Sequence, residues 1–269
     1  MLDSVAFVFP GQGSQAVGMG ADLAGRFPVC RETFQEADDR LGFALSRLCF
    51  EGPEQELQLT ANAQPAILTA SVAACRALAA QGVKPAVVAG HSLGEYSALV
   101  AAGALSFGDA VTLVRHRGTY MQEATPVGVG AMAAVMGLDA AALDEICRRA
   151  AGVHEIVSPA NLNAPGQTVI SGHAAAVDRA IALAQEAGAR RAVKLAVSAP
   201  FHCALMQPAA DRLGRDLAAA RFHDLSVPLV ANVTAQALRS GDAARKRCAG
   251  RSRRRCCGSR ACAPCARWA

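Results

Sequence analysis

The chain has 269 residues, 52% of them hydrophobic, and a formal net charge of +5. Residues 243–269 carry nine Lys and Arg and no acidic residue, which leaves 18 basic against 22 acidic residues, a net charge of −4, for residues 1–242. A mildly acidic body argues against a nucleic-acid partner, and the length suits one α/β domain with a smaller inserted one.

The N-terminus and the apolar segments indicate a cytoplasmic protein. Met1–Pro10 has no basic region before its apolar run, so it predicts a first strand and not a secretion signal. The best candidate for a membrane span, Ala86–Leu105, contains His91 and Glu95, so no membrane segment is expected. Without an export signal, the cysteines are expected to be reduced thiols.

The first half of the chain predicts alternating strands and helices. Val5–Phe9 predicts a strand that leads into a Gly-rich loop, and helix-compatible sequence extends to about Arg47. The next predicted elements are a helix at Pro65–Ala80, a strand at Pro85–Ala89, a helix at Glu95–Ala102, and a helix capped by Ser106 that ends near Glu123.

The region from Pro126 to about Ala199 predicts the order β-α-β-β-α-β, which is the ferredoxin-like pattern. Its predicted strands and helices are Ala131–Met136, Ala140–Ala150, Ile156–Ala160, Gln167–Ser171, Ala174–Ala187 and Ala192–Val197. After it, a helix at Cys203–Ala220 and a strand at Pro228–Asn232 are expected. We therefore predict an α/β fold: an α/β-hydrolase-like main domain formed by residues 1–125 and 199–241, with an inserted ferredoxin-like subdomain at residues 126–198.

A tight turn follows the predicted strand Pro85–Ala89. The run Gly90-His91-Ser92-Leu93-Gly94 matches Gly-x-Ser-x-Gly at a strand-to-helix junction, the pattern of a nucleophile elbow. The glycines suit a turn that is too tight for side chains. The helix that begins there directs free N–H groups and the positive end of its dipole toward a developing oxyanion. The pattern predicts that Ser92 is the nucleophile of an acyl transfer.

A serine hydroxyl needs a general base. The chain has six histidines, at positions 91, 116, 154, 173, 202 and 223. His202 is the best candidate because it ends the rigid segment Ser198–His202, where the predicted insert rejoins the main domain and a cleft is expected. His116, within a helix, and His154 and His173, in loops of the insert, are better explained as surface residues.

The chain resembles the malonyl-CoA:acyl-carrier-protein transacylase family in four motifs. These are FVFPGQGSQ at Phe7–Gln15, AGHSLGEYSALVAAG at Ala89–Gly103, RHRGTYMQEA at Arg115–Ala124 and SAPFH at Ser198–His202. The resemblance extends through nearly all of residues 4–240. It implies a monomer that takes malonyl-CoA as substrate and acyl carrier protein as partner, with no cofactor and no metal.

The resemblance also implies roles for the catalytic residues. Ser92 would attack the malonyl thioester, and His202, oriented by a backbone carbonyl, would take its proton and later activate the phosphopantetheine thiol of the carrier protein. Backbone N–H groups of Leu93 and Gln12 would hold the oxyanion. Arg117 would pair with the free carboxylate of malonate.

Further positions match polar residues that line the family's cleft: Gln64, Asn161 and His91. Phe201 matches malonyl-selective relatives, since methylmalonyl-selective ones carry a smaller residue there. These matches imply transfer of a malonyl group for fatty-acid synthesis.

The family pattern stops near Gly241. The family continues past Pro228–Asn232 with a helix, a strand and a Gly-Pro-Gly loop, whereas residues 245–269 are almost wholly Arg, Cys, Ala, Gly and Ser without periodicity. The change indicates GC-rich coding sequence read in a shifted frame. We therefore predict no regular structure in residues 242–269 and a chain of low stability and weak activity. The alternative is a basic tail with a metal site at the CxxC of Cys262 and Cys265.

Other functions fit parts of the sequence. A serine esterase or thioesterase would share the elbow but has no use for a buried cation at Arg117, and a polyketide-pathway acyltransferase would share all the motifs. A binding protein whose basic tail contacts nucleic acid or membrane is disfavoured, because the tail's arginines are interleaved with cysteines and form no helical face.

Overall fold

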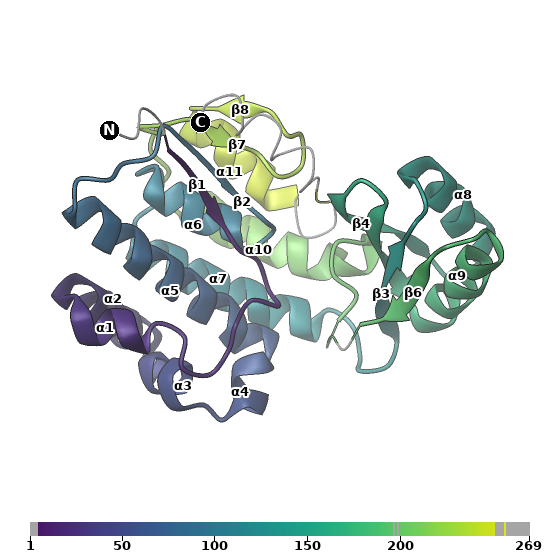
Figure 1. The fold of residues 1–269 in the computed structure, drawn as a ribbon, viewed down its shortest axis with the longest axis horizontal. Helices are drawn as coiled ribbons and strands as arrows, with labels where there is room; N and C mark the ends of the chain where they lie inside the picture. Colours follow the sequence, from purple (N-terminus) through teal and green to yellow (C-terminus); the bar gives the residue numbers. More distant parts are fainter. Residues whose placement is uncertain (1–4, 196, 198, 251–255, 257–269) are drawn as a thin grey trace.

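The computed structural model describes residues 5–195, 197, 199–250 and 256, and these residues form two four-stranded sheets (Figure 1). The first sheet, in the order β1-β2-β7-β8, belongs to the larger body. Its strands are β1 (Ala6–Phe9), β2 (Val87–Gly90), β7 (Leu229–Val230) and β8 (Ala237–Leu238). The first three are parallel and β8 is antiparallel to β7. All four residues of β2 are buried, which explains its short β-branched run.

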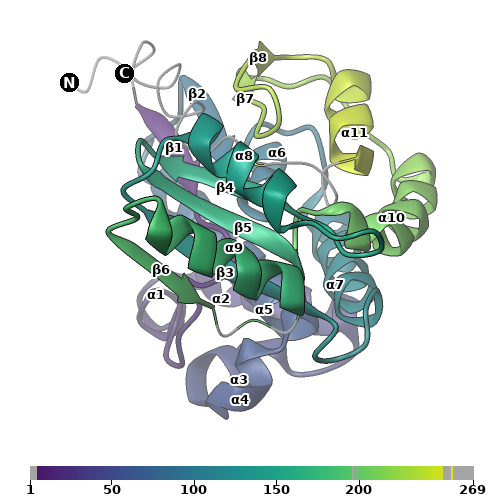
Figure 2. The same cartoon turned by 90° about the vertical axis from the view of Figure 1, so that its right-hand side faces the viewer.

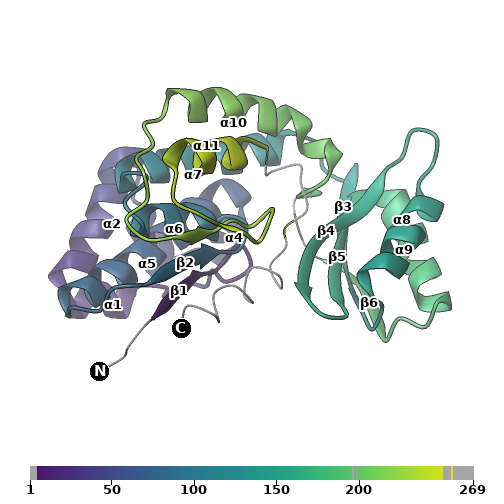
Figure 3. The same ribbon diagram turned by 90° about the horizontal axis from the view of Figure 1, so that it is seen from above.

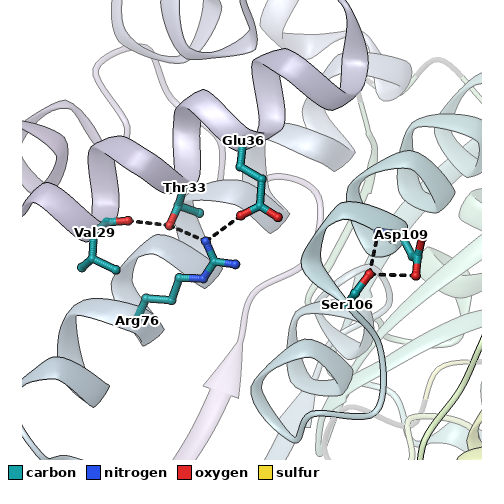
Figure 4. Close-up of polar contacts among 6 residues, drawn as sticks. All are labelled: Val29, Thr33, Glu36, Arg76, Ser106 and Asp109. Atoms are coloured by element: carbon teal, nitrogen blue, oxygen red, sulfur yellow. Dashed lines mark hydrogen bonds and ion pairs between the residues drawn. The ribbon is translucent and has the colours of Figure 1, made fainter.

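Nine helices of the described residues accompany this sheet. They are α1 (Ala21–Arg26), α2 (Pro28–Leu41), α3 (Leu45–Glu51), α4 (Glu54–Gln58), α5 (Thr60–Ala80), α6 (Gly94–Ala101), α7 (Phe107–Glu123), α10 (Gln207–Ala219) and α11 (Gly241–Gly250). The prediction that Ser106 caps α7 is confirmed, since its Oγ accepts the N–H of Asp109 (Figure 4). The same view shows Arg76 of α5 bonded to Thr33 and Glu36 of α2.

Helix α5 begins at Thr60, so the predicted start at Pro65 is wrong. Pro65 has no N–H to donate to the carbonyl of Ala61 one turn earlier, which ordinarily breaks a helix. In this fold Nη1 of Arg115 donates to that carbonyl at 2.8 Å, so the helix continues through the proline.

Among the described helices, α5 is the one that could cross a membrane by length and composition. More than half of its apolar window is buried in the protein, however, as in a core helix.

The second sheet has the order β4-β5-β3-β6 and is antiparallel throughout. It consists of β3 (Gly130–Met136), β4 (Val157–Ala164), β5 (Gln167–His173) and β6 (Arg191–Lys194), with helices α8 (Ala140–Ala150) and α9 (Ala174–Glu186). Figures 2 and 3 show both helices on the sheet face that points away from the larger body. The opposite face points toward that body. Strand β4 is longer than predicted and contains register shifts at Asn161 and near Ala164, while β6 ends before Val197.

The chain returns to the larger body through a short 3₁₀ turn, Ala204–Met206, and α10. The prediction of no regular structure after Gly241 is wrong for α11, where Ala244 and Cys248 are buried, four residues apart on one face of the helix. Cys256 is also buried and pairs with Asn161 of β4 through backbone hydrogen bonds to Ala160 and Leu162. The alternative considered for the tail, a metal site at Cys262 and Cys265, falls outside the described residues, as does Ser198.

Candidate active site

The turn between β2 and α6 holds Ser92 with a positive φ of 51°. A non-glycine residue in this region is strained, and such strain is retained where the surroundings fix it. The turn is closed so tightly that a Cβ on Gly90 would lie 2.0 Å from the carbonyl carbon of Gly94. A Cβ on Gly94 would lie 2.3 Å from the carbonyl oxygen of Phe9 in β1. Both glycines are therefore required for the serine to stand at the carboxyl end of β2.

The hydroxyl of Ser92 is in hydrogen-bond contact with His202, with 2.8 Å between Oγ and Nε2. Both residues are buried, at 9% and 4% exposure. His202 lies in the loop between β6 and α10 and also has a positive φ, of 62°. This is the arrangement in which an imidazole can take a hydroxyl proton.

Two cysteines adjoin this histidine. Cys203 donates its thiol to the carbonyl of Pro200 at 3.1 Å, and burial raises the pKa of that thiol, which keeps it neutral. The Sγ of Cys256 lies 3.3 Å from Nδ1 and 3.5 Å from Nε2 of His202. A sulfur nearly equidistant from both ring nitrogens cannot lie on the N–H axis of either one, so its contact with the ring is mainly packing. The resemblance implied a backbone carbonyl as the orienting group, and sequence reasoning did not anticipate this thiol.

A buried cation lies beside the nucleophile. Arg117, on α7, is 2% exposed, and its Nη2 donates to Oγ of Ser92 at 3.3 Å. Its Nη1 donates to Oε1 of Gln64 at 2.6 Å, and Nε2 of that glutamine contacts Sδ of Met121 at 3.6 Å. Gln64 therefore orients the guanidinium group, a contact that the sequence did not reveal. A fixed guanidinium in a closed site suits a carboxylate, which it can bind through two parallel bonds.

Two backbone N–H groups near Ser92 have no acceptor among the described residues: those of Leu93 and Gln12. The side chain of Gln12 is held by Thr60, with Nε2 3.0 Å from Oγ1. The N–H of Ser92 itself is occupied, since it donates to Oδ1 of Asn232 at 3.1 Å. Free N–H groups beside a nucleophile are the donors that stabilise an oxyanion.

The second sheet contributes asparagines to the opposite wall. His91 contacts Oδ1 of Asn163 at 3.2 Å and Nδ2 of Asn161 at 3.5 Å through its Nε2 atom. These contacts connect the elbow to β4, so the two sheets meet at the nucleophile.

All eight residues predicted for the site line one cleft of about 660 Å³. Gln12, Gln64, His91, Ser92, Leu93, Arg117, Asn161 and His202 share it with further residues that include Met121, Met132, Val169, Leu195 and Phe201. Among the described residues, no group of three His, Cys, Asp or Glu could hold a metal ion.

Sequence reasoning missed two buried residues next to the elbow, Asn232 and Glu95. The backbone N–H of Asn232 donates to Oε2 of Glu95 at 2.8 Å. The signal for Glu95 was a charged residue in an apolar helix directly after the elbow, whereas Asn232 gave none.

Comparisons with known proteins found matches along most of the chain. Residues 6–257 match the model of the acyl transferase domain. The malonyl CoA-acyl carrier protein transacylase of Escherichia coli K12 is 56% identical over 245 residues, which cover 91% of this chain and 79% of that protein. The corresponding Coxiella burnetii structure aligns with a TM-score of 0.92 at 50% identity, covering 95% of this chain and 81% of that one.

A structure described as a type II polyketide acyl-carrier protein in complex with its malonyl-transacylase is also similar, with a TM-score of 0.92 and 48% identity over 95% of this chain and 83% of that one. These matches establish a mixed α/β acyltransferase fold. The chain belongs to the acyl transferase family, among the malonyl CoA-acyl carrier protein transacylases.

Proposed function

We propose that the protein transfers a malonyl group from coenzyme A to the phosphopantetheine thiol of acyl carrier protein, for fatty-acid synthesis. The observation that carries the proposal is the buried cluster of Ser92, His202 and Arg117, in which one hydroxyl contacts both a base and a cation. A hydrolase of neutral esters needs the first contact but not the second.

The transfer takes place in two half-reactions. Oγ of Ser92 gives its proton to Nε2 of His202 and attacks the thioester carbonyl. The C–S bond then breaks and coenzyme A leaves as a thiol with that proton. In the second half, the carrier thiol gives its proton to His202 and attacks the malonyl ester. The C–O bond breaks and Ser92 regains its proton, so the enzyme follows a ping-pong sequence.

The other residues of the cleft position the acyl group. The N–H groups of Leu93 and Gln12 stabilise the tetrahedral oxyanion in both halves. Arg117, oriented by Gln64, holds the carboxylate of the malonyl group, while His91 and Asn161 line the wall from the second sheet. The chemistry uses no cofactor and no metal, and we expect a cytoplasmic monomer.

We further infer that the chain is an α/β-hydrolase-like domain, residues 1–125 and 199–241, with a ferredoxin-like insert at residues 126–198. The strand order β4-β5-β3-β6, together with the chain order β-α-β-β-α-β, supports the assignment of the insert. The parallel strands and the elbow at the end of β2 support the assignment of the main domain.

The intact mass of the full chain after incubation with malonyl-CoA tests the proposal. We expect a gain of one malonyl group in the wild type, no gain in Ser92→Ala, and loss of the group to added holo-carrier protein. Intact mass measures the fraction of chains that carry a malonyl group and not a rate, so a slow enzyme still gives the adduct. Absence of the adduct, or release of malonate to water at the same rate with and without carrier protein, would overturn the proposal.

A further inference from the structure

The amide of the nucleophile is held by a residue that lies 140 positions later in the chain. The N–H of Ser92 donates to Oδ1 of Asn232 at 3.1 Å, and the N–H of Asn232 donates to Oε2 of Glu95 at 2.8 Å. Asn232 and Glu95 are each 1% exposed. Glu95 follows Ser92 by three residues in the first turn of α6, where the helix dipole favours a carboxylate. Through these two hydrogen bonds, Asn232 connects the nucleophile, Ser92, to Glu95 in the helix that follows the elbow.

The position of Asn232 is fixed by the corner that follows β7. The neighbouring Ala231 donates its N–H to the carbonyl of Gln236 and accepts the N–H of Ala235, which closes the loop between β7 and β8. Strand β7 pairs directly with β2, the strand that carries the elbow. Asn232 thus approaches Ser92 from a rigid neighbour in the same sheet.

We propose that Asn232 is a positioning residue that holds the strained backbone of Ser92, with Glu95 holding Asn232; this inference rests on the proposed function. The acceptor at Oδ1 draws the Ser92 N–H away from the cleft and keeps φ at its positive value. The hydroxyl then stays aligned with His202, and the oxyanion meets only the free N–H groups of Leu93 and Gln12.

The NH₂ group of the Asn232 side chain, which makes no hydrogen bond among the described residues, supports this role. Nδ2 of Asn232 is buried and has no hydrogen-bond partner among the described residues. An unsatisfied buried donor is unfavourable, and a leucine of similar shape would fill the space without it. The asparagine therefore contributes through its oxygen, which is the atom that Ser92 uses.

Three variants of the full chain separate positioning from general stability. Asn232→Leu removes the acceptor at similar volume, and Asn232→Asp keeps an oxygen acceptor in the same place. Val230→Ala is the matched control, because it opens a space at a fully buried position of β7 and leaves Asn232 with both of its hydrogen bonds. For each variant, kcat and KM for malonyl-CoA, the thermal midpoint and the hydrogen-exchange rate of the Ser92 amide are measured.

We expect kcat of Asn232→Leu to fall about 100-fold, the loss that a displacement of the reacting group by about 1 Å produces. Its KM stays within about threefold, because the binding contacts to malonyl-CoA are retained. The kcat of Asn232→Asp should be about tenfold higher than that of Asn232→Leu, a difference on the scale of one hydrogen bond. Val230→Ala keeps kcat while its midpoint falls, and the Ser92 amide exchanges faster only in Asn232→Leu.

The inference is overturned if Asn232→Leu turns over like the wild type, if Asn232→Asp is as slow as Asn232→Leu, or if Val230→Ala loses as much kcat as Asn232→Leu. A wild type that transfers no malonyl group contradicts the proposed function instead. The exchange rate of the Ser92 amide then still decides whether Asn232 holds the elbow, because that measurement needs no substrate.

Discussion

Oγ of Ser92 lies 2.8 Å from Nε2 of His202, although the two residues are 110 positions apart and both have a positive φ. The first stands at the end of a strand and the second in a loop between the two sheets. Strained backbones of this kind persist only where several contacts fix them. The pair is therefore a product of the whole fold, and variants far from it in sequence can be used to test it.

Replacing Arg117 by Gln should change which acyl group is accepted. The malonyl carboxylate loses its guanidinium partner, so we expect kcat/KM for malonyl-CoA to fall by at least about 100-fold, or about 3 kcal/mol. Transfer of an acetyl group, which has no carboxylate, should be affected far less. Steady-state rates with malonyl-CoA and acetyl-CoA measure both effects. The control is Arg212→Gln, whose arginine pairs with Glu123 on the surface. An equal loss for the two substrates would contradict the assigned role.

Arg115 and Pro65 should be coupled energetically through the carbonyl of Ala61. Arg115→Ala leaves this carbonyl without its donor, so we expect a loss of about 1.5 kcal/mol or more in the free energy of unfolding. In that background, Pro65→Ala supplies the missing helical N–H and should restore about 1 kcal/mol. Urea unfolding of the two single variants and the double variant measures the coupling. Strictly additive effects would show that the carbonyl is not the shared partner.

Cys49 should make stability fall at alkaline pH. Burial, with a smaller contribution from Asp38, raises the pKa of this thiol from 9.0 to about 12. Since the folded state holds the proton more tightly, the contribution is complete below pH 9 and is lost as the pH rises toward 12. At about 1.4 kcal/mol per pKa unit, the whole loss is about 4 kcal/mol.

Urea midpoints of the wild type and of Cys49→Ala between pH 7 and about 10.5 isolate this thiol from other groups that titrate there. The advantage of the wild type over the variant should shrink by about 2 kcal/mol across that range. A constant difference between the two proteins would contradict the prediction.

Gly90→Ala should abolish acylation of Ser92, because the added Cβ would lie 2.0 Å from the carbonyl carbon of Gly94. The elbow must then open, and the hydroxyl loses its alignment with His202. Gly214→Ala is the matched control: its Cβ meets nothing within 4 Å, and it lies inside α10. We expect that change to stabilise the protein by about 0.5–1 kcal/mol and to leave acylation intact. Intact mass with malonyl-CoA and thermal unfolding measure both.

Short-range patterns in the sequence predicted most of the fold. The elbow, the Ser106 cap and the β-α-β-β-α-β order of elements along the chain around the second sheet follow from local periodicity and from turn residues. The start of α5 could not be predicted in this way, because the group that replaces the missing N–H of Pro65 comes from Arg115 on another helix. Helix α11 was missed because it packs through small residues, Ala244, Cys248 and Ala249, which leave no clear apolar periodicity among the basic ones.

The site divides in a similar way. Ser92 and His202 could be predicted from motifs, because a tight turn and a rigid loop need particular residues. Asn232 and the Gln64–Arg117 bond could not, since each depends on contacts between segments that only the folded chain brings together. The prediction of low stability and weak activity for the altered C-terminus stays a prediction, which the mass and unfolding experiments address.

Helix α5 gives the protein a vulnerability during synthesis. Its apolar window is exposed in the newly made chain until α7, α2 and α6 pack against it. The same helix carries Gln64 into the cleft and receives Arg115 from α7. Substitutions that loosen its packing should therefore lower the yield of soluble protein and disturb the orientation of Arg117 together.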